Sequence, residues 1–128
     1  MKNKLFYLGI LVGICACMSK EEVLHEQYRV EGLAMYQKHC ENCHQADGKG
    51  FKKLYPALVG TGIIKRISDE QMARIIKHGI KPDGKHEFMP GNKELQAIEI
   101  AEIITYLKDL NGVKEGIVEQ KLVKEVIE

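Results

Sequence analysis

Residues 40 to 44 read Cys40-Glu41-Asn42-Cys43-His44. Two thiols three positions apart, followed directly by an imidazole, form the spacing by which c-type haem is attached to a chain. Each thiol can add to one vinyl group of the porphyrin, and the two residues between them span the gap. The imidazole of His44 then lies where it can ligate the iron from one face. The pentapeptide therefore predicts a covalently bound haem c, with Cys40 and Cys43 as attachment residues and His44 as an axial ligand.

Other roles of the cysteine pair match the sequence less well. A disulfide between Cys40 and Cys43 would close a very small loop and stabilise the chain little through entropy. Zinc takes about four ligands, and the remaining histidines show no second paired spacing. A thioredoxin-like dithiol needs a strand-to-helix context, which the surrounding sequence lacks. Haem attachment is therefore favoured over a redox dithiol or a metal site.

The length of 128 residues suits one domain. Trp is absent, and the chain has only three Phe and five Tyr residues. A haem would supply a large apolar group to a core that is short of aromatic side chains.

Residues 1–17 have the pattern of an export signal. A basic start precedes an apolar run over residues 5–14, which is too short for a comfortable membrane span. The end of the segment, Ile14-Cys15-Ala16-Cys17, is similar to a bacterial lipobox. We therefore predict a signal peptide over 1–17 and acylation of Cys17, with an ordinary cleaved signal and a retained anchor as the alternatives. Each of the three places the following domain outside the cytoplasmic membrane.

The remaining chain predicts a polar tether over 18–27, a folded domain over 28–112 and a tail over 113–128. Apolar periodicity and capping residues indicate three main helices, at about residues 26–39, 68–79 and 93–110. No strand pattern of any length is present, so the fold class is all-α. The apolar residues at positions 118, 122 and 126 of the tail share one helical face. They predict either a short docked helix or a frayed extension.

The order of helix, Cys-x-x-Cys-His motif, turn-rich loop, proline segment, helix, Met-Pro loop and helix resembles a class I cytochrome c. The resemblance covers about residues 28 to 110. It implies a small cytochrome c fold, in which three main helices wrap around one covalently attached haem. It also implies that Gly32 lies where the first helix crosses the last, facing Tyr106.

The same resemblance implies roles for three residues beyond the motif. The Pro56 carbonyl would accept a hydrogen bond from Nδ1 of His44 and so fix the orientation of that ring. Leu58 would pack on the haem, and Met89 would be the second axial ligand.

Met89 also has support from the residues themselves. Among the five methionines, it alone lies in a long predicted loop, where Pro90 and Gly91 fix the backbone and permit close approach. His86, three positions earlier, is the rival ligand. The choice matters because Met/His ligation raises the reduction potential of a haem.

The net charge of +1 is unevenly distributed. Residues 48–86 carry a net charge of +6, whereas residues 18–47 carry −3 and residues 87–128 carry −4. In a cytochrome c fold the basic segment would surround the haem, where it would steer an acidic redox partner. A merely solvated basic face is the alternative. The near-neutral total does not favour nucleic acid as a partner.

These features together predict a single-electron carrier rather than an enzyme. It would shuttle electrons between redox proteins or membrane respiratory complexes on the periplasmic side of the cytoplasmic membrane, held there by a lipid on Cys17. The alternative is a haem enzyme, or a gas or peroxide sensor, in which Met89 leaves the iron open and His86 or His78 serves as a distal group. A third class is a structural or redox-regulatory domain that uses the dithiol without haem.

Overall fold

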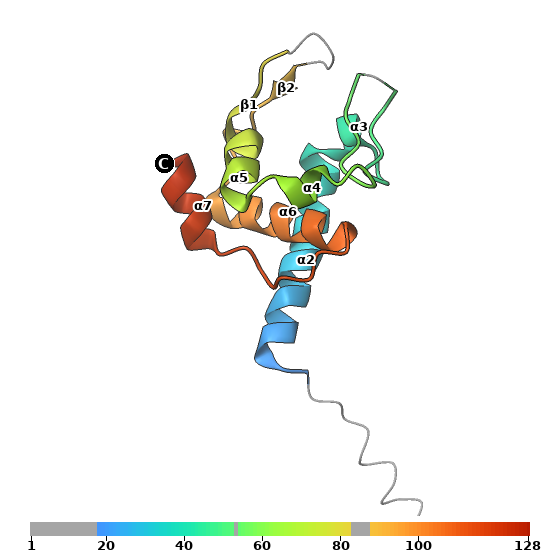
Figure 1. Ribbon diagram of the computed structural model, residues 1–128. Coiled ribbons are helices and arrows are strands. Elements are labelled where there is room, and N and C mark those ends of the chain that lie inside the picture. The colour runs from blue at the N-terminus through green and yellow to red at the C-terminus, as the bar shows by residue number, and fades with distance from the viewer. Residues whose placement is uncertain (1–17, 53, 83–87) are drawn as a thin grey trace, which may run out of the picture.

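The computed structural model describes residues 18–52, 54–82 and 88–128. Over this part of the chain the fold is mainly helical (Figure 1). The body consists of α2 (Lys20–His39), α5 (Asp69–His78) and α6 (Ala97–Leu110), and shorter helices are α3 (Glu41–His44), α4 (Ile63–Arg66) and α7 (Gln120–Ile127). The predicted all-α fold with three main helices is confirmed.

Helices α2 and α6 cross at Gly32. A Cβ atom at this position would overlap the carbonyl oxygen of Glu102 and lie 2.8 Å from Cβ of Tyr106. Only glycine permits so close an approach of two backbones. One turn further along α2, the fully buried Tyr36 packs its ring 5.4 Å from that of Tyr106. The predicted crossing of Gly32 opposite Tyr106 is therefore present.

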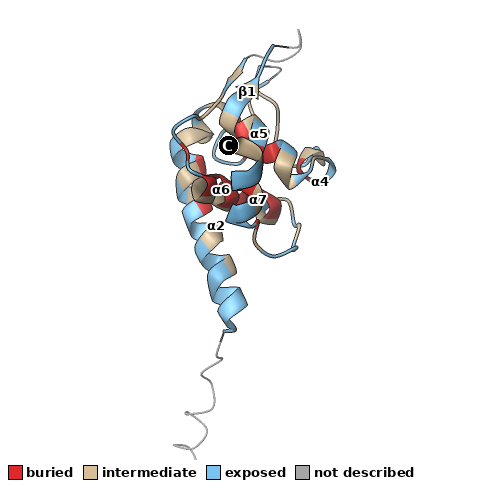
Figure 2. Ribbon diagram, turned by 90° about the vertical axis from the view of Figure 1, so that its left-hand side faces the viewer, coloured by how far each residue is buried: buried red, intermediate tan, exposed pale blue. Residues whose placement is uncertain are grey.

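Helix α6 lies at the centre of the core. The side chains of Ile100, Ile103 and Ile104 are all fully buried, and Leu107 is nearly so. Figure 2 shows that buried residues gather on α6 and on the helix faces that meet it. Because α2, α5 and α7 all pack on this helix, it fixes their positions relative to one another.

Helix α2 begins earlier than the sequence predicted, at Lys20 instead of about residue 26. Ser19 and Glu22 form a capping box: the Glu22 amide donates to Oγ of Ser19 at 3.1 Å, and the Ser19 amide donates to the Glu22 carboxylate at 2.7 Å. Most of the segment predicted as a polar tether, 18–27, is therefore helical, and the first turns of α2 project from the body (Figure 1). Within the described residues, no helix combines the length and the apolar character needed to cross a bilayer.

Helix α6, by contrast, begins later than predicted, at Ala97 instead of about residue 93. The ammonium group of Lys77 donates to the carbonyl oxygens of Lys93 and Leu95 at 2.7 and 2.8 Å. A helix that began at residue 93 would need these two carbonyl oxygens as acceptors of its own backbone hydrogen bonds. Their contacts with Lys77 therefore favour a later start of α6. Helix α5 begins and ends as expected, with a capping box at Ser68 and a glycine at position 79 whose φ is +79°.

Two strands of two residues, absent from the sequence prediction, follow α5. β1 (Gly79–Ile80) pairs antiparallel with β2 (Met89–Pro90), and Ile80 lies opposite Met89. A Cβ atom on Gly79 would overlap the Met89 carbonyl oxygen, so glycine is required for this pairing. In the sequence, His86 falls between the segments that form β1 and β2, and it belongs to the residues that the structure does not describe. Because β1 directly follows α5, this pairing holds the backbone of Met89 next to the end of that helix.

The tail forms a docked helix, which decides between the two predicted alternatives. Val118 and Val123 are buried, and α7 packs against α5 and α6. The Val118 amide donates to Oγ1 of the buried Thr105 at 3.0 Å. Lys108 of α6 is buried and bonds both Asp69 and Glu115 at 3.0 Å, which ties the tail to α5 and α6.

Candidate functional site

The cysteine motif is itself helical, as α3. The amide of His44 donates to the Cys40 carbonyl oxygen at 2.9 Å, and the amide of Cys43 donates to the same oxygen at 3.2 Å. Residues three and four positions apart on a helix share one face. The two thiols and the imidazole are therefore presented together.

The imidazole of His44 is buried and held in one orientation. Its Nδ1 atom lies 3.0 Å from the carbonyl oxygen of Pro56. A carbonyl oxygen can only accept, so Nδ1 carries a proton, and in the neutral ring Nε2 then holds the lone pair. This is the tautomer that a histidine needs in order to ligate a metal through Nε2. The contact expected between His44 and Pro56 is thus present.

Two adjoining hollows, with volumes of about 290 and 100 Å³, form a crevice beside His44. They share five lining residues: His44, Pro56, Ile63, Ile80 and Met89. Cys43 lines the larger hollow, while Cys40 and Leu58 line the smaller one. The crevice therefore brings together all six residues that the sequence singled out. Their roles toward a haem stay predictions.

The rest of the inner lining was not predicted as part of a site. It is apolar and comes from α4 and the residue after it, β1, α5 and α6: Ile63, Ile64, Ile67, Met72, Ile75, Ile76, Ile80, Ile103 and Leu107. The members on α5 and α6 follow ordinary helical periodicity in the sequence, which does not separate a cofactor wall from a protein core.

The thiols of Cys40 and Cys43 are free, and their environment is unlike that of a redox dithiol. Burial, with a smaller contribution from Cys43, raises the pKa of the Cys40 thiol to about 11. Reactive dithiols have a lowered pKa, because the thiolate is the nucleophile. The buried thiol of Cys40 therefore lacks the lowered pKa that is typical of a reactive dithiol.

The residues present fit a haem c. Two thiols lie at the edge of an apolar crevice, which suits a planar porphyrin. An imidazole with a free Nε2 and a thioether line the same crevice, and both are axial ligands of haem iron in cytochromes c.

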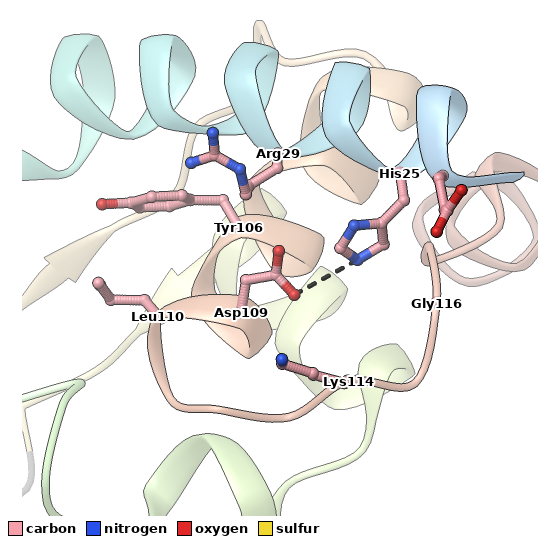
Figure 3. A pocket seen from close by; sticks show the side chains of 8 residues that line it. His25, Arg29, Tyr106, Asp109, Leu110, Lys114 and Gly116 are labelled. Carbon is pink, nitrogen blue, oxygen red and sulfur yellow. Dashed lines mark ion pairs between the residues drawn. The ribbon is translucent and has the colours of Figure 1, made fainter. Parts of the chain in front are cut away.

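A larger hollow of about 730 Å³ lies elsewhere, between the start of α2 and the end of α6 (Figure 3). Within it, Nε2 of His25 lies 3.3 Å from the Asp109 carboxylate. None of the predicted site residues lines it. This contact joins the second turn of α2 to α6.

The known proteins that are similar to this chain are cytochromes, which is consistent with a crevice that fits a haem. Residues 30–107 match the model of the family described as cytochrome c oxidase, cbb3-type, subunit III. The chain is 30% identical to the cytochrome c subunits of alcohol dehydrogenase (quinone) from Gluconacetobacter polyoxogenes and Komagataeibacter europaeus. Each alignment extends over 91 residues and covers 66% of this chain and 19% of the relative. It is 31% identical over 105 residues to the fructose dehydrogenase cytochrome subunit of Gluconobacter japonicus, covering 75% of this chain and 22% of that relative. The chain thus spans about a fifth of the length of the curated relatives that it matches.

Proposed function

Because the chain belongs to the cytochrome c family, as a class I cytochrome c with a cbb3-type subunit III domain over residues 30–107, we propose that it carries single electrons by means of one haem c bound in the crevice. The observation that carries this proposal is the convergence of Cys40, Cys43, His44 and Met89 on one apolar crevice. The bound haem iron would take up and release one electron between its ferric and ferrous states.

The chain's own residues would hold and shield that group. Cys40 and Cys43 would attach it by thioether bonds. Nε2 of His44 would bind its iron, with the ring held by the Pro56 carbonyl. Met89 would bind the iron from β2, where its pairing with Ile80 holds the backbone in place. Two bound side chains would exclude small ligands, which supports a carrier over an enzyme or sensor.

The mouth of the crevice suits a protein partner. Two large apolar side chains that line it are about half exposed: Ile80 at 47% and Phe88 at 53%. The exposed Lys81 lines the same hollow. We define these three residues as the crevice rim. An apolar surface with a lysine beside it supports brief docking of an acidic redox protein, because the charge speeds encounter more than it strengthens the complex.

The relatives are cytochrome subunits of dehydrogenases. We therefore propose that the partner is a dehydrogenase or another respiratory complex at the periplasmic side of the cytoplasmic membrane. A lipid on Cys17, which lies outside the described residues, would keep the carrier at that surface. Metabolic labelling with radioactive palmitate tests the anchor: the wild-type chain should be labelled, and Cys17→Ala should not.

The haem proposal is tested by expressing the chain in cells that have active c-type maturation. A pyridine haemochrome assay and intact-mass measurement should give one covalent haem per chain. Cys40→Ser and Cys43→Ser should each lose one thioether bond, and the double variant should carry no covalent haem. A wild-type chain without covalent haem would contradict the proposal.

A further inference from the structure

The backbone is strained at the residue that directly follows His44. Gln45 has φ of 65° and ψ of 160°. This region is occupied almost only by glycine, because a Cβ atom crowds the backbone there. The side chain of Gln45 is exposed, so burial of the side chain does not explain the conformation. Other groups must hold it.

The carbonyl oxygen of Gln45 is held by two donors. Oη of Tyr36 donates to it at 2.7 Å, and the Gly48 amide donates to it at 3.1 Å. Tyr36 is fully buried, and its ring packs against that of Tyr106. Its hydroxyl therefore acts from a fixed position in the core and orients the strained peptide.

The strained residue starts the loop that returns to His44. The Gly50 amide donates to the His44 carbonyl oxygen at 2.9 Å. The Gly50 backbone also lies directly against the Tyr55 carbonyl, where a Cβ atom would not fit. The next carbonyl along the chain, that of Pro56, meets Nδ1 of His44. The loop that begins at Gln45 thus leads to the Pro56 carbonyl that contacts His44.

We propose that Tyr36 is a positioning residue for His44, acting through Gln45 and the loop that ends at Pro56. Its hydroxyl keeps Gln45 in a conformation that a non-glycine residue would leave, and the loop then keeps its carbonyl on the imidazole. This inference rests on the proposed function, in which His44 is the axial ligand. A hydrogen bond to Nδ1 makes the imidazole a more basic ligand, which favours ferric over ferrous iron.

The test compares Tyr36→Phe, Gln45→Gly and the double variant as haem-loaded proteins. Two measurements report on His44: the reduction potential, and the exchange rate of its Nδ1 proton by NMR on ¹⁵N-histidine-labelled ferrous protein. Tyr36→Phe should move the potential to a more positive value and speed proton exchange about tenfold, the factor expected for one hydrogen bond. Gln45→Gly should restore both values in the double variant, because glycine occupies this conformation without strain.

Two controls separate positioning from a general loss of stability. Gln45→Ala keeps a Cβ atom, so Tyr36→Phe combined with Gln45→Ala should show no restoration. Tyr106→Phe removes a hydroxyl from the neighbouring ring and leaves the bond between Tyr36 and Gln45 in place, so both measurements should match the wild type.

Restoration by Gln45→Ala as well as by Gln45→Gly would overturn the inference. So would a Tyr36→Phe variant whose potential and proton exchange equal those of a wild type that carries haem. Absence of covalent haem in the wild type would instead overturn the proposed function itself.

Discussion

The backbone of Gly32 lies directly against the carbonyl oxygen of Glu102, with no room for a side chain between them. This contact sets the distance between α2 and α6. Because α3 continues directly from the end of α2, it also sets where the cysteine motif lies relative to the core.

Gly32→Ala should therefore lower the free energy of unfolding by about 2 kcal/mol, because the overlap is with backbone, which cannot rotate away. In a helix without this crossing, the same change would stabilise by about 1 kcal/mol. The sign of the change in unfolding free energy, measured in urea and followed by circular dichroism, thus shows whether the two backbones are in close contact at Gly32. Gln27→Ala, on the exposed side of the same helix, is the control and should change stability little.

Lys108 should stabilise the fold at neutral pH and lose this effect in alkali. Burial opposes its charge, but the hydrogen bonds that its ammonium group donates to Glu115 and Asp69 outweigh burial and raise its pKa above the ordinary 10.5. A raised pKa means that the contribution is complete below 10.5 and is lost as pH rises through the folded-state value. Lys108→Met should cost about 2 kcal/mol at pH 7. The difference from the wild type should shrink as the pH rises beyond 10.5 and through the raised folded-state value.

Thermal unfolding of both proteins from pH 7 to pH 12 checks this expectation. Lys114→Met removes an exposed lysine from the same region and serves as control. Equal stability of Lys108→Met and the wild type at pH 7 would show that the bonds to Asp69 and Glu115 only offset the cost of burial.

Val123→Ala tests the docking of the tail. The side chain of Val123 is fully buried between α7 and the body, so its truncation should cost about 1 to 2 kcal/mol. Lys121→Ala, two residues earlier with an 87% exposed side chain, should cost almost nothing. If the two variants unfold at the same denaturant concentration, the tail contributes little to the fold.

The crevice rim should attract anions. Oxidation of the ferrous protein by ferricyanide should slow about threefold at low ionic strength when Lys81 is changed to Glu. The control reverses the same amount of charge on α7, at Lys121. At an ionic strength of about 1 M, where the Debye length is about 3 Å, the variants should converge. Equal slowing by both variants would assign the effect to net charge instead of to the rim.

The sequence predicted the motif and the limits of α5, because each has a local signal: His44 by its spacing from the thiols, and Ser68 by its capping box. The crossing at Gly32 opposite Tyr106 was predicted from the resemblance to class I cytochromes c. The early start of α2 had a comparable signal, the pair Ser19 and Glu22, which the prediction overlooked.

Other features had no local signal. The strand pair at Met89 forms only because Gly79 admits the Met89 carbonyl. The late start of α6 depends on Lys77, which is 16 residues away in the chain from one acceptor and 18 from the other. The link from Tyr36 to Gln45 joins a core helix to a loop nine positions later. Such features depend on contacts between residues that are far apart in the chain, and the periodicity of the sequence does not predict them.

The most direct test of the account is whether carbon monoxide binds to the ferrous wild-type protein and to Met89→Ala, followed by optical spectroscopy. His86→Ala is the control for the rival ligand. We predict a low-spin wild type and a low-spin His86→Ala variant that do not react with carbon monoxide, and a Met89→Ala variant that binds it. A wild-type protein that binds carbon monoxide would contradict the account, because its iron would have an open or labile sixth position.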